Sequence, residues 1–248
     1  MKLQDKVIIV TGASSGIGEA ISLLLAEEGA VVVMGARRED LLNELCKKIN
    51  DRGGKASFVI TDVTFRGDLD RLVKHALEEY GRLDAIINNA GVMPLSYVEL
   101  MDFEGWDSMI DTNFKGVLHG VGAVLPYFLE QNNGHIINVS SDAGGKTIPG
   151  GAIYSATKAA VNVFSEGLRS ELSSRKGIRV TCIQPGATMS EIANTIEDPL
   201  VIEERNKAKL NDIRMLMPED VAHAVCYALC ASKRASINEI VIRPTDQP

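Results

Sequence analysis

The chain has 248 residues, of which 45% are hydrophobic and 24% are charged, and its formal net charge is −7 at pH 7. This length suits one large α/β domain or two small ones, and no apolar run approaches the roughly 18 residues that a membrane-spanning helix needs. The acidic chain has no basic stripe, which disfavours a nucleic-acid-binding surface. The histidines show no HExxH spacing, so we expect no metal site. The four cysteines show no CxxC spacing and no disulfide framework, which predicts a reducing, cytoplasmic location.

Short apolar strands and helical stretches alternate along the whole chain. Strands are expected at 6–12, 31–36, 55–64, 84–91, 134–141, 178–186 and 237–244, with helical periodicity between most of them. Several of these strands are almost continuous Val and Ile, which is typical of strands that helices cover on both faces. The sequence therefore predicts a single α/β domain over residues 1–248: a Rossmann-like, doubly wound parallel sheet with helices on both faces.

The first expected strand runs into a Gly-rich segment, TGASSGIG, which opens the following helix. Gly12 permits a tight turn, Gly16 lets the backbone approach a pyrophosphate, and Gly18 allows close helix–strand packing. The free N–H groups at a helix start also face an anion, which the helix dipole favours. This strand–turn–helix frame predicts a dinucleotide site made of Gly12, Ser14, Ser15, Gly16, Ile17 and Gly18.

The end of the second expected strand distinguishes the two nicotinamide cofactors. NAD-binding proteins usually have an acid there that holds the ribose hydroxyls, but this chain has no acid before Glu39. Arg37 and Arg38 stand there instead, and a guanidinium suits a phosphate. We therefore expect NADP (NADPH), with NAD less favoured, and Arg37 is the better candidate of the two arginines.

The third and fourth expected strands end on residues that suit the adenosine half of the same cofactor. Asp62, followed by Val63, can accept a hydrogen bond from the adenine amine, although an ordinary strand-end turn explains it equally well. The motif NNAG ends the next strand with small residues against which adenosine can lie. The expected binding residues there are Asn89, Ala90 and Gly91.

The stretch AIYSATKAAVNVF places Tyr154 and Lys158 one turn apart on one face of an expected helix. A phenol can give a proton to a carbonyl oxygen that receives hydride, and a phenolate can act as the base in the reverse reaction. An ordinary tyrosine pKa is about 10, and a cation about 4 Å away, at an effective dielectric constant of about 20, contributes enough to bring it to about 7. We interpret the pair as catalytic rather than as a chance combination of a core tyrosine and a surface lysine.

Five motifs together resemble those of the short-chain dehydrogenase/reductase family. They are TGASSGIG, NNAG, NVSS, YSATK and QPG, in the family's order between Thr11 and Gly186. The resemblance implies a nicotinamide-dependent oxidoreductase that acts on CH–OH and C=O groups. It assigns the active site to Asn113, Ser141, Tyr154 and Lys158, with Ser140 as the second choice for the serine.

The resemblance also implies roles for these residues. Tyr154 is the general acid/base that Lys158 supports, Ser141 holds the substrate oxygen, and Asn113 holds a water that relays protons from Lys158.

The resemblance also implies contacts between the motif QPG and the nicotinamide. The turn at Pro185 and Gly186 would lie beside the ring, together with Tyr154 and Lys158. Either Thr188 or Ser190 would hold the carboxamide, and the sequence leaves this choice open.

Residues 190–217 are polar and helix-prone and follow this turn. In the family such a segment covers the substrate, and closing it excludes water. Lys146 and Arg214 are candidates for binding a substrate carboxylate, although a solvated surface position is the preferred interpretation of both.

The predicted function is NADPH-dependent hydride transfer to or from a small carbonyl or alcohol substrate. One alternative is NAD-linked oxidation of a hydroxy acid or alcohol, which Arg37 disfavours. Another is a nucleotide-sensing protein without turnover, which the presence of both Tyr154 and Lys158 disfavours. The resemblance further implies a homo-oligomer, a tetramer or dimer. The acidic charge and the lack of a long apolar run predict no nucleic-acid or membrane partner.

Overall fold

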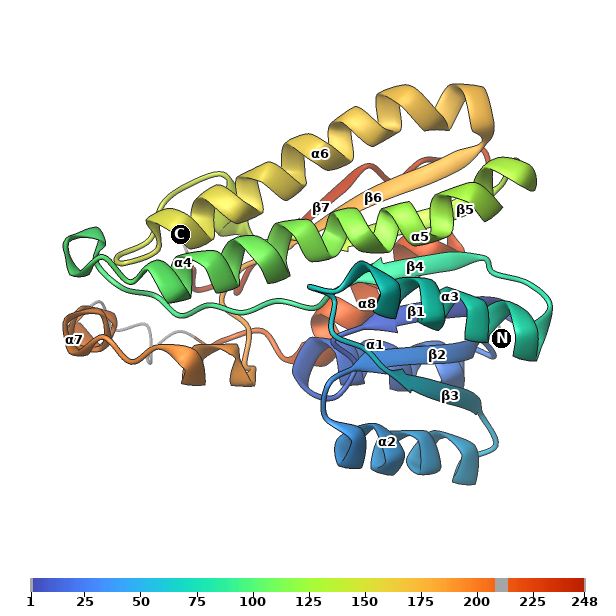
Figure 1. Ribbon diagram of the computed structural model, residues 1–248, viewed down its shortest axis with the longest axis horizontal. Helices are drawn as coiled ribbons and strands as arrows, with labels where there is room; N and C mark the ends of the chain where they lie inside the picture. Colours follow the sequence, from blue (N-terminus) through green and yellow to red (C-terminus); the bar gives the residue numbers. More distant parts are fainter. Residues whose placement is uncertain (1, 208–213, 248) are drawn as a thin grey trace.

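A computed structural model describes residues 2–207 and 214–247 of the chain. Within these residues the centre of the molecule is a seven-stranded, all-parallel sheet in the order β3-β2-β1-β4-β5-β6-β7 (Figure 1). The strands are β1 (Val7–Thr11), β2 (Val31–Ala36), β3 (Lys55–Ile60), β4 (Ala85–Asn88), β5 (Gly134–Val139), β6 (Ile178–Pro185) and β7 (Glu239–Ile242). The chain builds outward from β1 to β3 and then returns to continue from β4, which confirms the predicted doubly wound sheet.

Helices cover both faces of this sheet (Figure 1). One face carries α1 (Gly16–Glu27), α2 (Glu39–Asp51) and α8 (Pro218–Cys230), and the other carries α3 (Arg66–Tyr80), α5 (Gly116–Glu130) and α6 (Ala152–Lys176). Alternate residues of β1 enter opposite apolar cores, with Ile8 and Val10 in one and Val7 and Ile9 in the other. Every residue of β1 is therefore buried, which explains the unbroken apolar pattern.

Shorter elements lie near the carboxyl ends of the strands. They are η1 (Val98–Leu100), α4 (Phe103–Met109), the π-helical η2 (Ile110–Lys115), η3 (Asp142–Gly144), η4 (Glu191–Thr195) and α7 (Pro199–Lys207). The predicted covering segment, 190–217, contains η4 and α7, while residues 208–213 of it lie outside the described residues. Figure 1 shows α7 beyond the carboxyl end of the sheet. At this end the connections that follow β1 and β4 run in opposite directions, and a ligand usually binds at such a point in this kind of fold.

None of the helices in the described ranges is long and apolar enough to cross a membrane.

At the amino end of the strands, Asp84 connects the start of β4 with the start of β1 by hydrogen bonds. Its carboxylate accepts hydrogen bonds from the Lys6 ammonium at 2.9 Å, the Val7 N–H at 3.0 Å and the Arg82 guanidinium at 2.7 and 2.8 Å. Burial alone would raise the pKa of this carboxyl, but the bonds from Arg82, Lys6 and Val7 outweigh burial and lower the pKa. The folded protein therefore favours the ionised carboxylate.

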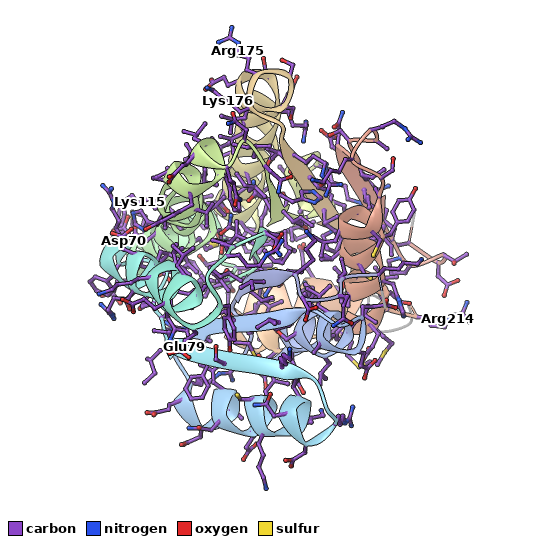
Figure 2. All side chains as sticks on the ribbon, turned by 90° about the vertical axis from the view of Figure 1, so that its right-hand side faces the viewer. Asp70, Glu79, Lys115, Arg175, Lys176 and Arg214 are labelled. Carbon is purple, nitrogen blue, oxygen red and sulfur yellow. The ribbon has the colours of Figure 1, made fainter. Side chains whose placement is uncertain are left out.

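We expect Asp84→Asn to lower the free energy of unfolding at pH 7 by about 2 kcal/mol, since hydrogen bonds to a charged group contribute about 1.5–3 kcal/mol. Because the pKa is lower in the folded than in the unfolded chain, the ionised carboxylate stabilises the fold at neutral pH, and this contribution disappears as the pH falls through the folded-state pKa. Urea unfolding of both proteins across the acid range measures the difference. The exposed Asp70 on α3 (Figure 2) provides a control variant, Asp70→Asn, which should match the parent at every pH. Equal stability of the Asp84 variant and the parent at pH 7 would contradict this account.

Candidate active site

The predicted binding residues gather in one cleft of about 1050 Å³ at the carboxyl edge of the sheet. This volume slightly exceeds the roughly 300–1,000 Å³ of small-molecule sites, so a dinucleotide and a small substrate can share it. The predicted residues that line it are Gly12, Ser14, Ser15, Gly16, Ile17, Arg37, Arg38, Asp62, Val63, Asn89, Ala90, Gly91, Ser141, Tyr154, Lys158, Pro185, Gly186, Thr188 and Ser190. Gly18 and Asn113 are not part of this lining.

The Gly-rich loop has the backbone that its glycines were predicted to allow. Gly12 and Gly16 adopt left-handed conformations, with φ of +64° and +55°, which favour glycine. A Cβ on Gly12 would lie 2.8 Å from the Cα of Ala90, and one on Gly18 would overlap the carbonyl oxygen of Gly12. At the N-cap of α1, Ser15 forms no side-chain capping bond, which leaves the first N–H groups of the helix available to an anion. The loop therefore fits the pyrophosphate of a dinucleotide.

Asn89 and Thr11 hold this loop against the end of β4. The Asn89 amide donates to the carbonyl oxygens of Thr11 at 3.0 Å and Gly12 at 3.3 Å. In return the Thr11 hydroxyl accepts from the N–H groups of Asn89 at 3.1 Å and Ala90 at 3.2 Å. The motif NNAG thus fixes the position of the Gly-rich loop through hydrogen bonds, in addition to lining the cleft.

The two arginines after β2 differ in their contacts. Arg38 donates hydrogen bonds to the hydroxyls of Ser14 and Ser15 and forms an ion pair of 2.9 Å with Glu191. Arg38 lowers the pKa of Glu191, with Ser15 contributing. Arg37, the better candidate on sequence grounds, is exposed at the mouth of the cleft, and its guanidinium has no ion-pair partner among the described residues. The structure therefore joins Arg38, not Arg37, to the Gly-rich loop.

Asp62 lies in a strand-end turn of its own. Its carboxylate accepts hydrogen bonds from the N–H of Thr64 at 2.9 Å and from the Thr64 hydroxyl at 2.8 Å. Asp62 nevertheless lines the cleft, so the turn and a contact with a ligand are compatible.

Helix α6 places Tyr154 and Lys158 one turn apart, and the segment after β5 brings Ser141 beside them. Ser141 and Tyr154 form a hydrogen bond, and the Ser141 hydroxyl also lies 3.4 Å from the carbonyl oxygen of Pro185. The Ser140 hydroxyl points away from Tyr154 and donates to the carbonyl oxygen of Lys158 at 3.0 Å. Of the two candidate serines, Ser141 is therefore the one next to the phenol.

Burial raises the pKa of Tyr154 to about 12, while the bond with Ser141 acts in the opposite direction and the charge of Asp142 adds to the rise. The Lys158 ammonium lies 5.8 Å from the centre of the tyrosine ring. Burial is the largest influence on this pKa, which therefore rises, contrary to the expected fall to about 7. At neutral pH the phenol keeps its proton, which is the form that a proton donor needs.

Lys158 is buried and donates a hydrogen bond to the carbonyl oxygen of Val139 at 3.1 Å. Burial lowers the pKa of this amine to about 8, with Cys182 acting in the opposite direction. Most of the amine is thus charged at pH 7, and the charge is lost as the pH rises through about 8.

Asn113 lies in the π-helical turn η2, a rare element that occurs frequently at functional sites. Its side-chain oxygen accepts from the Val92 N–H at 2.8 Å, and its amide donates to the Val92 carbonyl oxygen at 2.9 Å and to the Thr157 hydroxyl at 3.3 Å. The side chain thus has protein partners on both its oxygen and its nitrogen, which gives it a positioning role not foreseen from the sequence. A Cβ on Gly91 would lie 3.3 Å from the Asn113 side-chain oxygen and 3.7 Å from the Lys158 nitrogen, so this glycine leaves room between cleft and amine.

The turn after β6 places Thr188 and Ser190, the two candidates for binding the carboxamide, in different surroundings. Thr188 donates to the carbonyl oxygen of Gly186 at 3.0 Å. Ser190 lies against the Gly-rich loop, where a Cβ on Gly16 would be 3.4 Å from its Cβ, and its hydroxyl forms no hydrogen bond within residues 2–207 and 214–247. Ser190 therefore has the hydroxyl that is available to a ligand.

Asp142 is a buried carboxylate beside the site whose partners no sequence motif predicts. Asp142 accepts hydrogen bonds from Arg243 at 3.1 Å and Gln247 at 2.8 Å, and Lys146 lies 3.3 Å from the same oxygen. Gln247 also accepts from the Ala187 N–H at 2.8 Å. Residues after β7 are thereby held at the edge of the cleft, about a hundred positions from Asp142 in the chain.

Neither predicted carboxylate-binding residue is free within the cleft. Lys146 lines it but is paired with Asp142. Arg214 projects into solvent (Figure 2), with 83% of its side chain exposed and Asp246 at 4.0 Å.

Comparisons with known proteins agree with this geometry. A family model described as short chain dehydrogenase matches residues 6–200. An oxidoreductase of Listeria monocytogenes, named "Uncharacterized oxidoreductase Lmo0432", is 46% identical over 250 residues that cover 100% of both chains.

Solved structures share the whole fold. The closed form of a serine dehydrogenase complexed with NADP+ superposes with a TM-score of 0.87 at 33% identity and covers 98% of this chain and 96% of its own. A short chain dehydrogenase/reductase from Burkholderia phymatum in complex with NAD reaches a TM-score of 0.88 at 26% identity, covering 97% of this chain and 90% of its own. Structural neighbours therefore bind either nicotinamide cofactor.

Proposed function

The chain belongs to the short-chain dehydrogenase family, and we propose that it transfers hydride between NADP(H) and a small carbonyl or alcohol substrate, with Tyr154 as general acid/base. Membership makes it an oxidoreductase. The observation that most supports the finer proposal is the buried Tyr154, bonded to Ser141 and one turn from Lys158, in the same cleft as the Gly-rich loop.

When bound, the nicotinamide supplies or accepts the hydride. The protein's own residues deal with the oxygen and its proton. The Ser141 hydroxyl holds the substrate oxygen by a hydrogen bond and shares the charge that develops on it. Tyr154 gives its proton to that oxygen during reduction, for which its protonated state at pH 7 is suited.

Lys158 stabilises, by its positive charge, the phenolate that forms when Tyr154 gives up its proton. Its ammonium is fixed by the bond to Val139 and is charged at neutral pH. Asn113 positions Val92 and Thr157 around these groups. The described part of segment 190–217 lines the cleft at Ser190 and farther along, and we assign it the role of covering the substrate and excluding water.

NADP is proposed over NAD because the end of β2 carries Arg37 and Arg38 where an NAD-binding protein would have an acid. Guanidinium groups bind a phosphate through charge-assisted hydrogen bonds. Ser14 and Ser15 add hydroxyls beside Arg38. At the other end of the cofactor, the available hydroxyl of Ser190 suits the carboxamide.

Nicotinamide absorbance during incubation with aldehydes, ketones and hydroxy acids tests this proposal. NADPH and NADH are compared in parallel, and we expect turnover with a higher kcat/KM for NADPH. Preference for NADH would overturn the cofactor assignment. Tight NADPH binding without turnover of any compound on a broad panel would instead support a nucleotide-sensing protein.

Glu191 presents a carboxylate to the same Arg38 and Ser15 that we assign to the cofactor phosphate. We expect Glu191→Gln to tighten NADPH binding about three- to fivefold, because an exposed ion pair contributes up to about 1 kcal/mol and this one competes with the ligand. NADH, which lacks the 2′-phosphate, should gain little. Fluorescence titration with each nucleotide measures the two dissociation constants.

Glu203→Gln is the matched control, because Glu203 pairs with Lys207 on α7 and does not line the cleft. An equal gain for NADH and NADPH, or no gain for either, would contradict competition at Arg38.

A further inference from the structure

Helix α7 turns one arginine toward the cleft. Val201 is fully buried in an apolar cluster that also contains Tyr154 and Met93. Arg205 follows Val201 by four positions and therefore lies on the same face of the helix. It lines the cleft together with Tyr154 and is partly buried. Arg205 and Tyr154 thus line the same cleft, and the helix face that carries Arg205 also carries Val201, which packs in the same apolar cluster as Tyr154.

Arg205 has no protein partner within residues 2–207 and 214–247: no carboxylate pairs with it, and its guanidinium forms no hydrogen bond. Burial lowers its pKa, and no neighbouring charge acts in the opposite direction. A partly desolvated cation without a compensating partner is unfavourable for the protein alone. The position therefore needs an explanation other than stability.

The dipole of α7 does not supply that explanation. A cation in the last turn of a helix interacts favourably with its carbonyl end, but this requires no burial. Lys207 occupies the same turn with 70% of its side chain exposed and pairs with Glu203. Arg205, in contrast, faces the cleft.

The other cationic side chains of the cleft are either engaged or at its adenosine end. Arg38 pairs with Glu191, and Lys146 pairs with Asp142. Lys158 donates to the carbonyl oxygen of Val139, and Arg37 lies directly after β2, where the adenosine half of a dinucleotide is expected. Arg205 is the cation that remains available to a substrate among the described residues that line the cleft.

We propose, taking the proposed oxidoreductase as the premise, that Arg205 binds the carboxylate of the substrate, so that the natural substrates are small hydroxy acids and the corresponding oxo acids. A guanidinium binds a carboxylate through two parallel hydrogen bonds. The apolar side chains of Met93 and Ile148, which line the cleft, suit the carbon chain between carboxylate and reacting carbon. The reaction balances in the direction of reduction: NADPH would supply the hydride to the carbonyl carbon, the Tyr154 phenol gives its proton to the carbonyl oxygen and regains one from solvent, and the carboxylate stays unchanged.

Short oxo acids and their methyl esters test this assignment, since each ester keeps the reacting carbonyl and removes only the charge. The probes are acetoacetate and succinate semialdehyde with their esters, assayed with NADPH. We expect the parent protein to prefer each acid over its ester. Arg205→Gln should lower kcat/KM for the acids about 10- to 100-fold, mainly through KM, because a hydrogen-bonded charge pair is lost. The esters should change little, so the preference for acids disappears.

Arg205→Lys keeps the positive charge but cannot form the two parallel hydrogen bonds of a guanidinium, so this variant should retain part of the preference for acids over esters. Arg175→Gln removes an exposed cation at the far end of α6 (Figure 2) and should behave as the parent protein. NADPH titration and thermal unfolding of each variant confirm that the cofactor site and the fold are intact.

The outcomes separate the two proposals. If neutral ketones and esters are reduced but the acids are not preferred, or if Arg205→Gln leaves the acid-to-ester ratio unchanged, Arg205 is not the carboxylate site and the proposed oxidoreductase stands. If no carbonyl compound is reduced with either nucleotide, the premise fails, and the assignment of Arg205 fails with it.

Discussion

Replacing Tyr154 with phenylalanine is expected to lower kcat about 10³-fold, within the roughly 10²–10⁴-fold that a positioned general acid contributes. The variant keeps the ring in its apolar cluster and removes only the hydroxyl that bonds to Ser141. Without it no phenolic proton reaches the substrate oxygen. NADPH affinity should change little, because the Gly-rich loop and the arginines after β2 are untouched.

Steady-state reduction of one active substrate, together with NADPH titration, measures both quantities. Tyr227→Phe is the matched control: Tyr227 lies on α8 with 63% of its surface exposed, and this variant should keep the parent kcat. A Tyr154→Phe protein that retains the parent kcat would remove Tyr154 from the proposed chemistry. Loss of NADPH binding in the same variant would point to a disturbed cleft instead.

Lys158→Met is expected to lower kcat for reduction about 10²-fold and to change its pH dependence. The ammonium is 5.8 Å from the ring of Tyr154. An ammonium about 6 Å from a phenolate oxygen, at an effective dielectric constant of about 20, stabilises the phenolate by about 3 kcal/mol, or about 10² in rate. The amine is charged below its pKa of about 8 and neutral above it. The rate of the parent protein should therefore fall as the pH rises through about 8, and the variant should show no such fall.

The measurement is kcat for reduction from pH 6 to pH 9.5 with saturating NADPH. Lys176→Met, which alters an exposed lysine at the far end of the same helix (Figure 2), should keep both the rate and the fall near pH 8. A fall that persists unchanged in Lys158→Met would assign the titration to another group.

The sheet and the phosphate end of the cleft were predictable because their signals are local. Runs of Val and Ile such as Val31–Met34 can only be buried on both faces, and they are. The conformation of Gly12 follows from a tight turn between one strand and one helix, which a short motif specifies. The partners of Asp142 had no local signal, because Arg243 and Gln247 reach it only once the last strand is in place.

Two features of the substrate end depend on packing that no short motif encodes. The π-helical turn at Asn113 is held by Val92 and Thr157, which lie 21 and 44 positions away. Arg205 occurs in a charged stretch where every side chain is compatible with solvent, and its direction depends on the burial of Val201. The pKa of Tyr154 was wrongly expected to fall, because the burial that raises it is a property of the assembled core.

The all-parallel sheet described above also governs how this chain acquires its shape. Parallel neighbours such as β5 and β6 pair residues that are distant in sequence, with Gly134 opposite Ile178, and each such pairing must close a long loop before it gains any stability. Proteins dominated by such non-local contacts fold more slowly than helical bundles of similar length. The cleft draws on Gly12 from the first strand connection and Ser190 from a late one, so it is complete only when both halves of the sheet have joined. During that interval the apolar strands are exposed, and nascent chains at high concentration are vulnerable to aggregation.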